Sequence, residues 1–281
     1  MNKVKHKLNK KNIVTKFRPK IRSRHPSHGC LRGTIQRMPF SSVIRFGSTT
    51  PCATRVELNT IEAIKNSSSK LRMKNCFKKG QVKTAEWIQP QSVKEVKQFF
   101  NDYRDSGIVT KSHFGSRGQG NTLIKTEVEL NNWLNNHSGV LSNYIVEKFY
   151  NYSREYRLHV TKNGCFYTCR KMLKQDTPEN KRWYRNDSNS IWIKEENPDF
   201  NKPSNWEEVV TESVKALKST GLDFGAVDLR IQSDKIKGKK VNKNPEFIVI
   251  EINSAPSFGE ITQQKYKEIL PNLLQQKYNE Q

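Results

Sequence analysis

The chain has a very uneven distribution of charge, which limits the part of it that can form a core. The first acidic residue among its 281 is Glu57, whereas fourteen lysine and arginine residues precede it. Residues 1–25 also contain few apolar side chains, so this region offers little that folding could bury. We therefore expect residues 1–40 to be a basic, partly disordered arm and the folded part to begin near Ser41.

Two interpretations of the basic arm stay open. A block of cationic side chains attracts anions by long-range electrostatics and counterion release, which predicts contact with a polyanion such as nucleic acid through residues 1–55. The alternative is a solvated basic tail with no specific partner. The formal net charge of +23 belongs in large part to this arm and does not by itself define a function.

Composition favours a packed core that does not cross a membrane. Aromatic residues make up 10% of the chain, more than a disordered polycation would carry. No apolar run approaches the roughly 18 residues of a membrane-spanning helix, and the N-terminus lacks the apolar stretch of a signal peptide. The five cysteines are odd in number and scattered, which is typical of a reducing compartment. We expect a cytoplasmic protein without a membrane partner.

Cys165 and Cys169 are the one cysteine pair that could suggest a metal or redox site. Their spacing predicts that both lie on one face of a strand. No second pair of cysteines or histidines lies nearby in the sequence, so we expect these two side chains to pack in the core.

Apolar residues recur at strand and helix periods in an order that favours an α+β fold. Strands are expected at 43–47, 55–59, 107–111, 122–125, 144–149, 157–160, 165–172, 224–232 and 246–253. Helices are expected at 59–79 (in two parts), 92–104, 130–136 and 204–220. Residues 176–205 are polar and are expected to form a long surface loop or lid. Hairpins, rather than regular βαβ units, indicate a layered α+β domain.

A glycine-rich loop lies between two of the expected strands. It contains Gly115, Ser116, Gly118 and Gly120. Glycines allow a tight turn that brings backbone N–H groups against a phosphate chain, and Lys111 at the base of the loop could reach phosphate oxygens. Neither a dinucleotide fingerprint nor a P-loop fits, because no helix and no Gly-Lys-Ser/Thr follows. An ordinary hairpin turn with a surface lysine is the alternative.

Three oxygen-bearing side chains fall on the last two expected strands. Glu251 and Asn253 are two residues apart and therefore point to the same face, with Ile250 and Ile252 expected on the buried side. Asp228 joins them if its strand pairs alongside. Two carboxylates and a carboxamide suit a hard ion such as Mg²⁺. The alternative is a set of ordinary polar residues on a half-exposed strand.

A third group of charged residues occupies the segment 147–157. Glu147 appears where this strand leaves the core, and it could present a carboxylate to a purine amine. Arg157 could stabilise charge that develops on a phosphate. For Arg154 and Glu155 we expect a surface ion pair.

Taken together, these motifs resemble the ATP-grasp superfamily of carboxylate–amine ligases, most of all ribosomal-protein glutamate ligases and D-alanine–D-alanine ligases. The likeness covers roughly residues 59–260. Its motifs, in the family's order, are Lys70 in Ser69–Lys74, Lys111 with the glycine loop, Glu147 in Tyr144–Phe149, Glu155-Tyr156-Arg157, and Asp228 with Glu251 and Asn253. The last motif is the most specific of the five.

The resemblance implies a role for each matched residue. Lys70 and Lys111 would contact the ATP phosphates under the glycine-rich lid. The adenine-binding hinge would consist of Glu147, Lys148 and Phe149. Arg157 would act on the phosphate side. The metal ligands would be Asp228, Glu251 and Asn253, holding two Mg²⁺ ions, with Mn²⁺ as an alternative. A looser match suggests an acceptor and phosphate side made by Lys171, Arg185 and Asn186.

The resemblance also implies an organisation into parts. Residues 41–105 would be a shortened linking region with the first ATP lysine, 106–150 the small ATP-grasp subdomain with its lid, and 151–281 the large subdomain with the metal site. The family usually has a full α/β domain before the first lysine, whereas only 69 residues precede Lys70 here. This departure concerns the substrate site more than the nucleotide site.

The implied activity is ATP-dependent ligation. ATP would phosphorylate a carboxylate, and an amine of the amino acid or peptide class would attack the acylphosphate, with release of ADP and phosphate. Two alternatives stay open: a phosphotransferase that stops at the phosphorylated product, and a nucleic-acid-binding protein whose ATP site is vestigial or regulatory.

Overall fold

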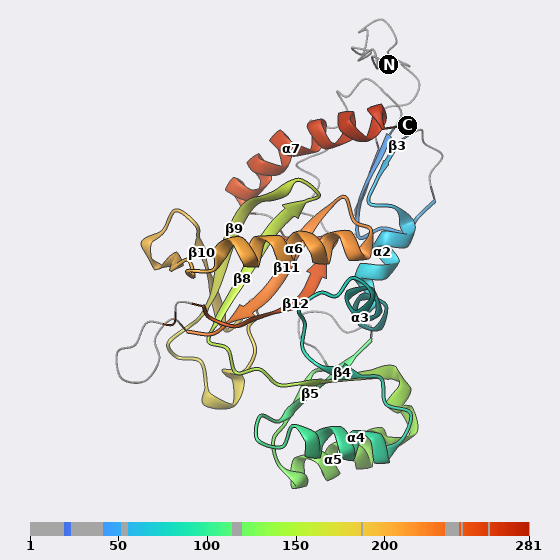
Figure 1. Ribbon diagram of the computed structural model, residues 1–281, viewed down its shortest axis with the longest axis vertical. Helices are drawn as coiled ribbons and strands as arrows, with labels where there is room; N and C mark the ends of the chain where they lie inside the picture. The colour runs from blue at the N-terminus through green and yellow to red at the C-terminus, as the bar shows by residue number, and fades with distance from the viewer. Residues whose placement is uncertain are drawn as a thin grey trace, which may run out of the picture.

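The computed structural model describes residues 20–23, 42–51, 56–113, 120–186, 188–233, 242, 244–257 and 259–280. Within them, three sheets carry the architecture (Figure 1). The first is a parallel sheet of β1 (Lys20–Ser23), β2 (Ser42–Phe46) and β3 (Val56–Leu58). The other two sheets are antiparallel. Those expected site residues that belong to strands all lie in one or the other of these two sheets.

The small antiparallel sheet has the strand order β4-β7-β5-β6. Its strands are β4 (Trp87–Ile88), β5 (Ile108–Ser112), β6 (Thr122–Ile124) and β7 (Tyr144–Lys148). Helices α4 (Val93–Asp102) and α5 (Glu127–His137), followed by the 3₁₀ segment η3 (Ser138–Asn143), pack on it at the lower end of Figure 1. Helix α5 begins with a capping box in which Thr126 and Glu129 satisfy each other's backbone N–H groups.

The large antiparallel sheet has the order β10-β9-β8-β11-β12. Its strands are β8 (Arg154–Thr161), β9 (Gly164–Leu173), β10 (Ser190–Lys194), β11 (Phe224–Ile231) and β12 (Phe247–Asn253). Strand β10 pairs with β9 inside the stretch 176–205, so the expectation of one long surface loop there is wrong. The 3₁₀ turns η4 (Glu179–Lys181) and η5 (Pro198–Phe200) lie on either side of β10 in the sequence.

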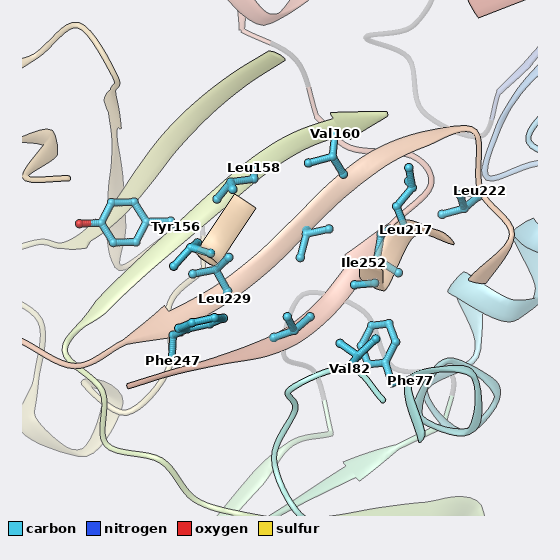
Figure 2. Packing of buried hydrophobic residues seen from close by; sticks show 14 of the residues in the cluster. Phe77, Val82, Tyr156, Leu158, Val160, Leu217, Leu222, Leu229, Phe247 and Ile252 are labelled. Carbon is cyan, nitrogen blue, oxygen red and sulfur yellow. The ribbon is translucent and has the colours of Figure 1, made fainter. Parts of the chain in front are cut away.

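One face of the large sheet is the main core. Helices α2 (Ile61–Ser68), α3 (Lys70–Lys79) and α6 (Trp206–Thr220) contribute to it. Figure 2 shows Tyr156, Leu158 and Val160 of β8 on the same side of the sheet as Leu217 of α6. Helix α6 ends where expected, because Gly221 takes the left-handed conformation (φ 79°) that favours glycine.

The C-terminal helix α7 (Glu260–Asn279) covers part of the opposite face. It buries Tyr266, Leu270 and Leu274 in a second cluster that includes Phe46 of β2 and Phe224 of β11. This helix was not expected from the sequence. It contains Pro271, a residue that removes one backbone hydrogen bond from a helix. Helix α7 therefore owes its stability to this packing more than to local preference.

Candidate functional site

The face of the large sheet opposite the main core carries two rows of mostly polar side chains. Residues directly opposite each other on paired strands share one face, so the strand register defines these rows. The first row is Lys194, Cys169, Arg157, Asp228 and Glu251. The second row is Trp192, Lys171, Glu155 and Arg230. This face is the reverse of the core face shown in Figure 2.

Asp228 and Arg157 form a buried bidentate ion pair in the first row. The Arg157 Nε and Nη2 atoms lie 2.7 and 2.8 Å from the two carboxylate oxygens. Burial alone would raise the pKa of Asp228, but the Arg157 guanidinium holds it below its ordinary value. The pKa of Arg157 is raised, because its attraction to Asp228 outweighs its own burial. The sequence assigned these residues to metal and phosphate separately, and the structure brings them together.

Glu251 and Asn253 lie beside Asp228. The Asn253 Nδ2 atom donates to Asp228 Oδ2 (3.3 Å) and to Glu251 Oε1 (3.2 Å), so both carboxylates lie around one amide. A β-bulge at Ile250 makes this arrangement, because Asp228 pairs with Glu251 and Leu229 with Val249. Ile252 is buried as expected, but Ile250 is not, since the bulge removes it from the alternation.

The donor set fits a magnesium ion. Asp228 and Glu251 are like charges in directly opposite positions, and in this structure the Arg157 guanidinium is the cation that pairs with Asp228. No group of three or more His, Cys, Asp or Glu side chains suited to a metal occurs in the described residues. Two carboxylates with the Asn253 amide oxygen are nevertheless sufficient for Mg²⁺, which takes its remaining ligands from water and phosphate.

Glu147 of β7 forms the second half of the candidate site. Its carboxylate lies 2.6 Å from Lys111 Nζ of β5 and 3.0 Å from Lys74 Nζ of α3. Burial would raise the pKa of Glu147, but the two ammonium groups hold it below the ordinary value. Lys74 is fully buried and also donates to Thr84 Oγ1 at 2.5 Å. In this structure, Lys111 therefore contacts a carboxylate at the base of the glycine loop.

Lys70 lies between the two halves. Its backbone N–H donates to the carbonyl of His113, immediately after β5, at 3.1 Å. Burial lowers the pKa of its ammonium group, and Glu251 opposes this effect through its charge. Lys111 and Glu147 also act on the Lys70 charge. The Lys70 ammonium group thus interacts electrostatically with Glu251 of the first row and with Glu147 and Lys111 of the small sheet.

The other expected nucleotide-binding residues are placed as follows. Gly115, Ser116 and Gly118 lie outside the described residues. Gly120 follows them with a left-handed φ of 73°, a conformation suited to glycine. In the expected hinge, the backbone N–H of Lys148 donates to the backbone carbonyl of Glu86 (2.9 Å). The backbone N–H of Phe149 donates to the backbone carbonyl of Gly107 (3.0 Å).

The second row corrects one expectation. Arg154 and Glu155 are 3% and 6% exposed, so they do not form a surface ion pair. Arg154 donates to the carbonyl of Gln232, whereas Glu155 pairs with Lys171, Arg185 and Arg230.

Asn186, the third residue of the expected acceptor side, organises its own loop. Its Oδ1 accepts hydrogen bonds from the backbone N–H groups of Ser188 and Asn189 at 3.0 and 3.1 Å. These hydrogen bonds of Asn186 are local to its loop. Lys171 and Arg185, by contrast, form ion pairs with Glu155.

Comparisons with known proteins concern the domain and the fold. Residues 75–190 match the family model described as the ATP-grasp domain. The protein contains an ATP-grasp domain. The expected fold class, an α+β ATP-grasp fold, is thereby confirmed. Among curated protein sequences, none matches this chain.

Several solved structures have a similar fold. D-alanyl-alanine synthetase A from Vibrio cholerae has a TM-score of 0.58 at 13% identity, over 85% of this chain and 77% of that one. N5-carboxyaminoimidazole synthetase from Staphylococcus aureus, complexed with ADP, has a TM-score of 0.59 at 17% identity, over 83% and 60%. The ATP-grasp ligase PsnB with its minimal precursor has a TM-score of 0.53 at 13% identity, over 79% and 65%. This ATP-grasp chain thus spans less than two thirds of the PsnB chain.

The cysteine pair of this ATP-grasp chain is not arranged as expected. An extra residue in β9, Phe166, shifts the register between the pairs His159–Tyr167 and Val160–Cys165. Cys165 therefore packs against the core face, while Cys169 lies opposite Arg157 on the site face. Burial raises the pKa of both thiols to about 12. The two residues do not share a face, because the bulge reverses the alternation between them.

Sequence reasoning also missed several residues that border the site. Lys74 is four residues after Lys70, one helical turn further along α3, and this spacing could have placed both lysines on one face. Arg230 is two residues after Asp228 on the same strand, which predicts a shared face. Trp192 had no such signal, because strand β10 itself was not expected.

No helix among the described residues has the length and apolar character needed to cross a membrane.

Proposed function

We propose that this chain is an ATP- and Mg²⁺-dependent ligase that activates a substrate carboxylate as an acylphosphate and joins it to an amine of the amino acid or peptide class. The observation that carries the proposal is the convergence of Asp228, Glu251 and Asn253 with Arg157 on one sheet face, next to Lys70. Similar folds support it: PsnB has been solved with precursor, Mg and ADP, and the S. aureus synthetase with ADP.

The residues divide the work of phosphoryl transfer. Asp228, Glu251 and Asn253 would hold Mg²⁺, which neutralises phosphate charge when bound. These three side chains would supply the protein oxygens for the two ions, and water and phosphate would supply the remaining ligands. Lys70 and Lys111 would contact the phosphates, and Lys111 would exchange Glu147 for a phosphate oxygen. The lid carrying Gly115, Ser116, Gly118 and Gly120 would exclude water from the acylphosphate.

The two chemical steps balance without a further reactant. A carboxylate oxygen attacks the γ-phosphorus, and the bond to the β–γ bridging oxygen breaks, so that ADP leaves. The amine nitrogen then attacks the acyl carbon, phosphate leaves, and the amine proton passes to solvent. Arg157 lies in the first row opposite the proposed metal ligand Asp228, where its guanidinium would stabilise charge on the transferring group. The hinge residues Glu147, Lys148 and Phe149 would receive the adenine.

Hydroxylamine provides the direct test, because it converts an acylphosphate into a stable hydroxamate. We expect the purified full chain, given ATP, Mg²⁺ and pooled carboxylic acids and acidic peptides, to form hydroxamate together with ADP and inorganic phosphate in equal amounts. Omission of Mg²⁺ should stop all three. A phosphorylated product without inorganic phosphate or hydroxamate would instead identify a phosphotransferase and contradict the ligase.

A further inference from the structure

The group around Glu155 contains more positive than negative charge. Three cations approach this single carboxylate: Arg230 at 3.1 Å, Lys171 at 3.7 Å and Arg185 at 3.7 Å. All four side chains are only 6–12% exposed. Within the described part of the chain, no second carboxylate forms an ion pair with any of the three. Buried charges are normally compensated, because leaving water is costly.

Arg185 shows the deficit most clearly. Its Nη2 atom donates to the carbonyl of Ser153 at 2.5 Å, whereas its buried Nε atom has no hydrogen-bond partner in the described structure. Burial lowers the pKa of Arg185 to about 10, and Glu155 offsets this only in part because Arg230 and Arg170 repel the charge. Among the described residues, the cluster therefore contains more cations than carboxylates.

Trp192 connects this cluster with the proposed reaction site. Its ring centroid lies 4.8 Å from Arg157 Cζ and 4.8 Å from Lys171 Nζ. At 39% exposure it is among the few large apolar side chains accessible to solvent in the described structure. Glu155 and Arg157 point to the same face two residues apart on β8, a separation of about 7 Å along the strand.

We propose that Lys171, Arg185 and Arg230, with Trp192 as a wall, bind a second acidic group of the carboxylate substrate. The substrate class is then a short dicarboxylate, or an acidic side chain close to another carboxylate. One carboxylate binds beside Glu155, among the three cations, and the other lies near Arg157 in the first row. This inference rests on the proposed function and narrows its substrate. Glu155 holds the three cations in place beside the bound acid.

Calorimetry on the full chain saturated with AMP-PNP and Mg²⁺ tests the inference. The probes are glutarate and its monoamide, which have the same length but two and one carboxylates. We expect glutarate to bind at least tenfold more tightly. The variants Arg185→Gln and Arg230→Gln should each bind glutarate only as weakly as the monoamide. Arg182→Gln is the matched control, because Arg182 lies in the same loop with a side chain 44% exposed, and it should behave as wild type.

The outcomes separate the two proposals. If AMP-PNP binds and the wild type does not prefer glutarate, or shows no glutarate binding, the second-acid site is contradicted while the proposed function stands. If Arg185→Gln loses AMP-PNP affinity but keeps its affinity for glutarate, the cluster is a phosphate site and the inference is overturned. If AMP-PNP does not bind the wild type, the proposed function fails as well.

Thermal unfolding shows whether Arg185 has only a structural role. Because its charge is poorly compensated in the folded state, Arg185→Gln should unfold at a temperature no lower than wild type does. A structural role would instead lower the unfolding temperature and leave the ratio of glutarate to monoamide affinity unchanged. Trp192→Phe provides a second, milder variant, for which we expect an intermediate loss of glutarate affinity.

Discussion

Two buried glutamates, Glu147 and Glu155, lie in similar surroundings but differ in how their charge is balanced. Glu147 is 4% exposed and pairs with two lysines that belong to different elements, α3 and β5. Glu155 is 6% exposed and pairs with three cations of the large sheet and its adjoining loop. The ion pairs of Glu147 thus connect α3 to the small sheet. The ion pairs of Glu155, by contrast, bring three positive charges to one negative charge on the large sheet and its adjoining loop.

The difference indicates which cations are available to ligands. Lys74 is fully buried and remains with Glu147, so Lys111 can move to a phosphate without leaving that carboxylate uncompensated. Around Glu155, by contrast, the cations already exceed the available carboxylate before any ligand binds. At Glu147, we therefore expect Lys111 to exchange the carboxylate for a phosphate. At Glu155, we expect the three cations to bind an additional anion.

The largest effect is expected away from Glu147 and Glu155, at the proposed metal ligands. Glu251→Ala and Asn253→Ala should each reduce ATP turnover to background, a loss of at least about a hundredfold, because each removes a proposed metal ligand. Urea unfolding should remain cooperative, since both side chains lie on the site face rather than in the core. Normal turnover in both variants would contradict the metal site and leave the two glutamate clusters as the main features of this region.

The glutamates themselves can be compared through their stability. Glu147→Gln should lower the free energy of unfolding by about 3–5 kcal/mol, because it leaves the fully buried Lys74 uncompensated. Glu155→Gln should lower it by a smaller amount, about 1–3 kcal/mol, since its cations keep some exposure and Arg185 keeps its bond to Ser153. Urea titration measures both values, and the reverse order would break the comparison.

Lys111→Ala sharpens the idea of an exchangeable partner. We expect ATP to bind about 10–100-fold more weakly, the equivalent of one charge-assisted contact to phosphate. Lys97→Ala, at an exposed position of α4, is the matched control. Calorimetry with AMP-PNP measures the affinity. An unchanged value for Lys111→Ala would mean that Lys111 serves only Glu147.

His159 extends the comparison to a buried group that is neutral. It is 1% exposed, its Nδ1 lies 3.1 Å from the Tyr266 hydroxyl, and burial lowers its pKa from 6.5 to about 3. Between these two values the unfolded chain binds a proton that the folded chain does not, so stability falls as the pH falls through this window.

A pH series of unfolding experiments checks this effect. The wild type should lose up to about 1.4 kcal/mol more per pH unit than His159→Asn between pH 6.5 and 3. Glu147 and Asp228 also have lowered pKa values, so both proteins lose stability in acid and the difference between them is the quantity of interest. Parallel curves would show that His159 is protonated in the folded state.

Much of the fold could be predicted from local patterns. The strands at 108–112 and 144–148 and the end of α6 at Gly221 agree with the sequence, because apolar period and glycine conformation act locally. Strand β10 and helix α7 could not be predicted in this way. Each depends on a distant surface: β10 on the edge of β9, and α7 on the cluster around Phe46.

The candidate site shows the same division. The sequence placed Asp228, Glu251 and Asn253 together because strand alternation is regular and the motif resembles a known family. It predicted that Ile250 would be buried with Ile252 and that Cys165 and Cys169 would share one face. Both predictions are wrong, because a β-bulge interrupts the alternation in each strand. A bulge depends on how two strands pair, and a single strand's sequence carries little sign of it.

The sequence by itself determined which chemical groups each strand carries and how they are spaced, since residue types and their spacing along a strand are local properties. The tertiary structure decided which charges compensate one another. Lys74 with Glu147, Arg157 with Asp228, and the three cations around Glu155 are separated by up to 75 positions in the chain. Electrostatic energy depends on distance in space and on burial, and only the folded chain sets both.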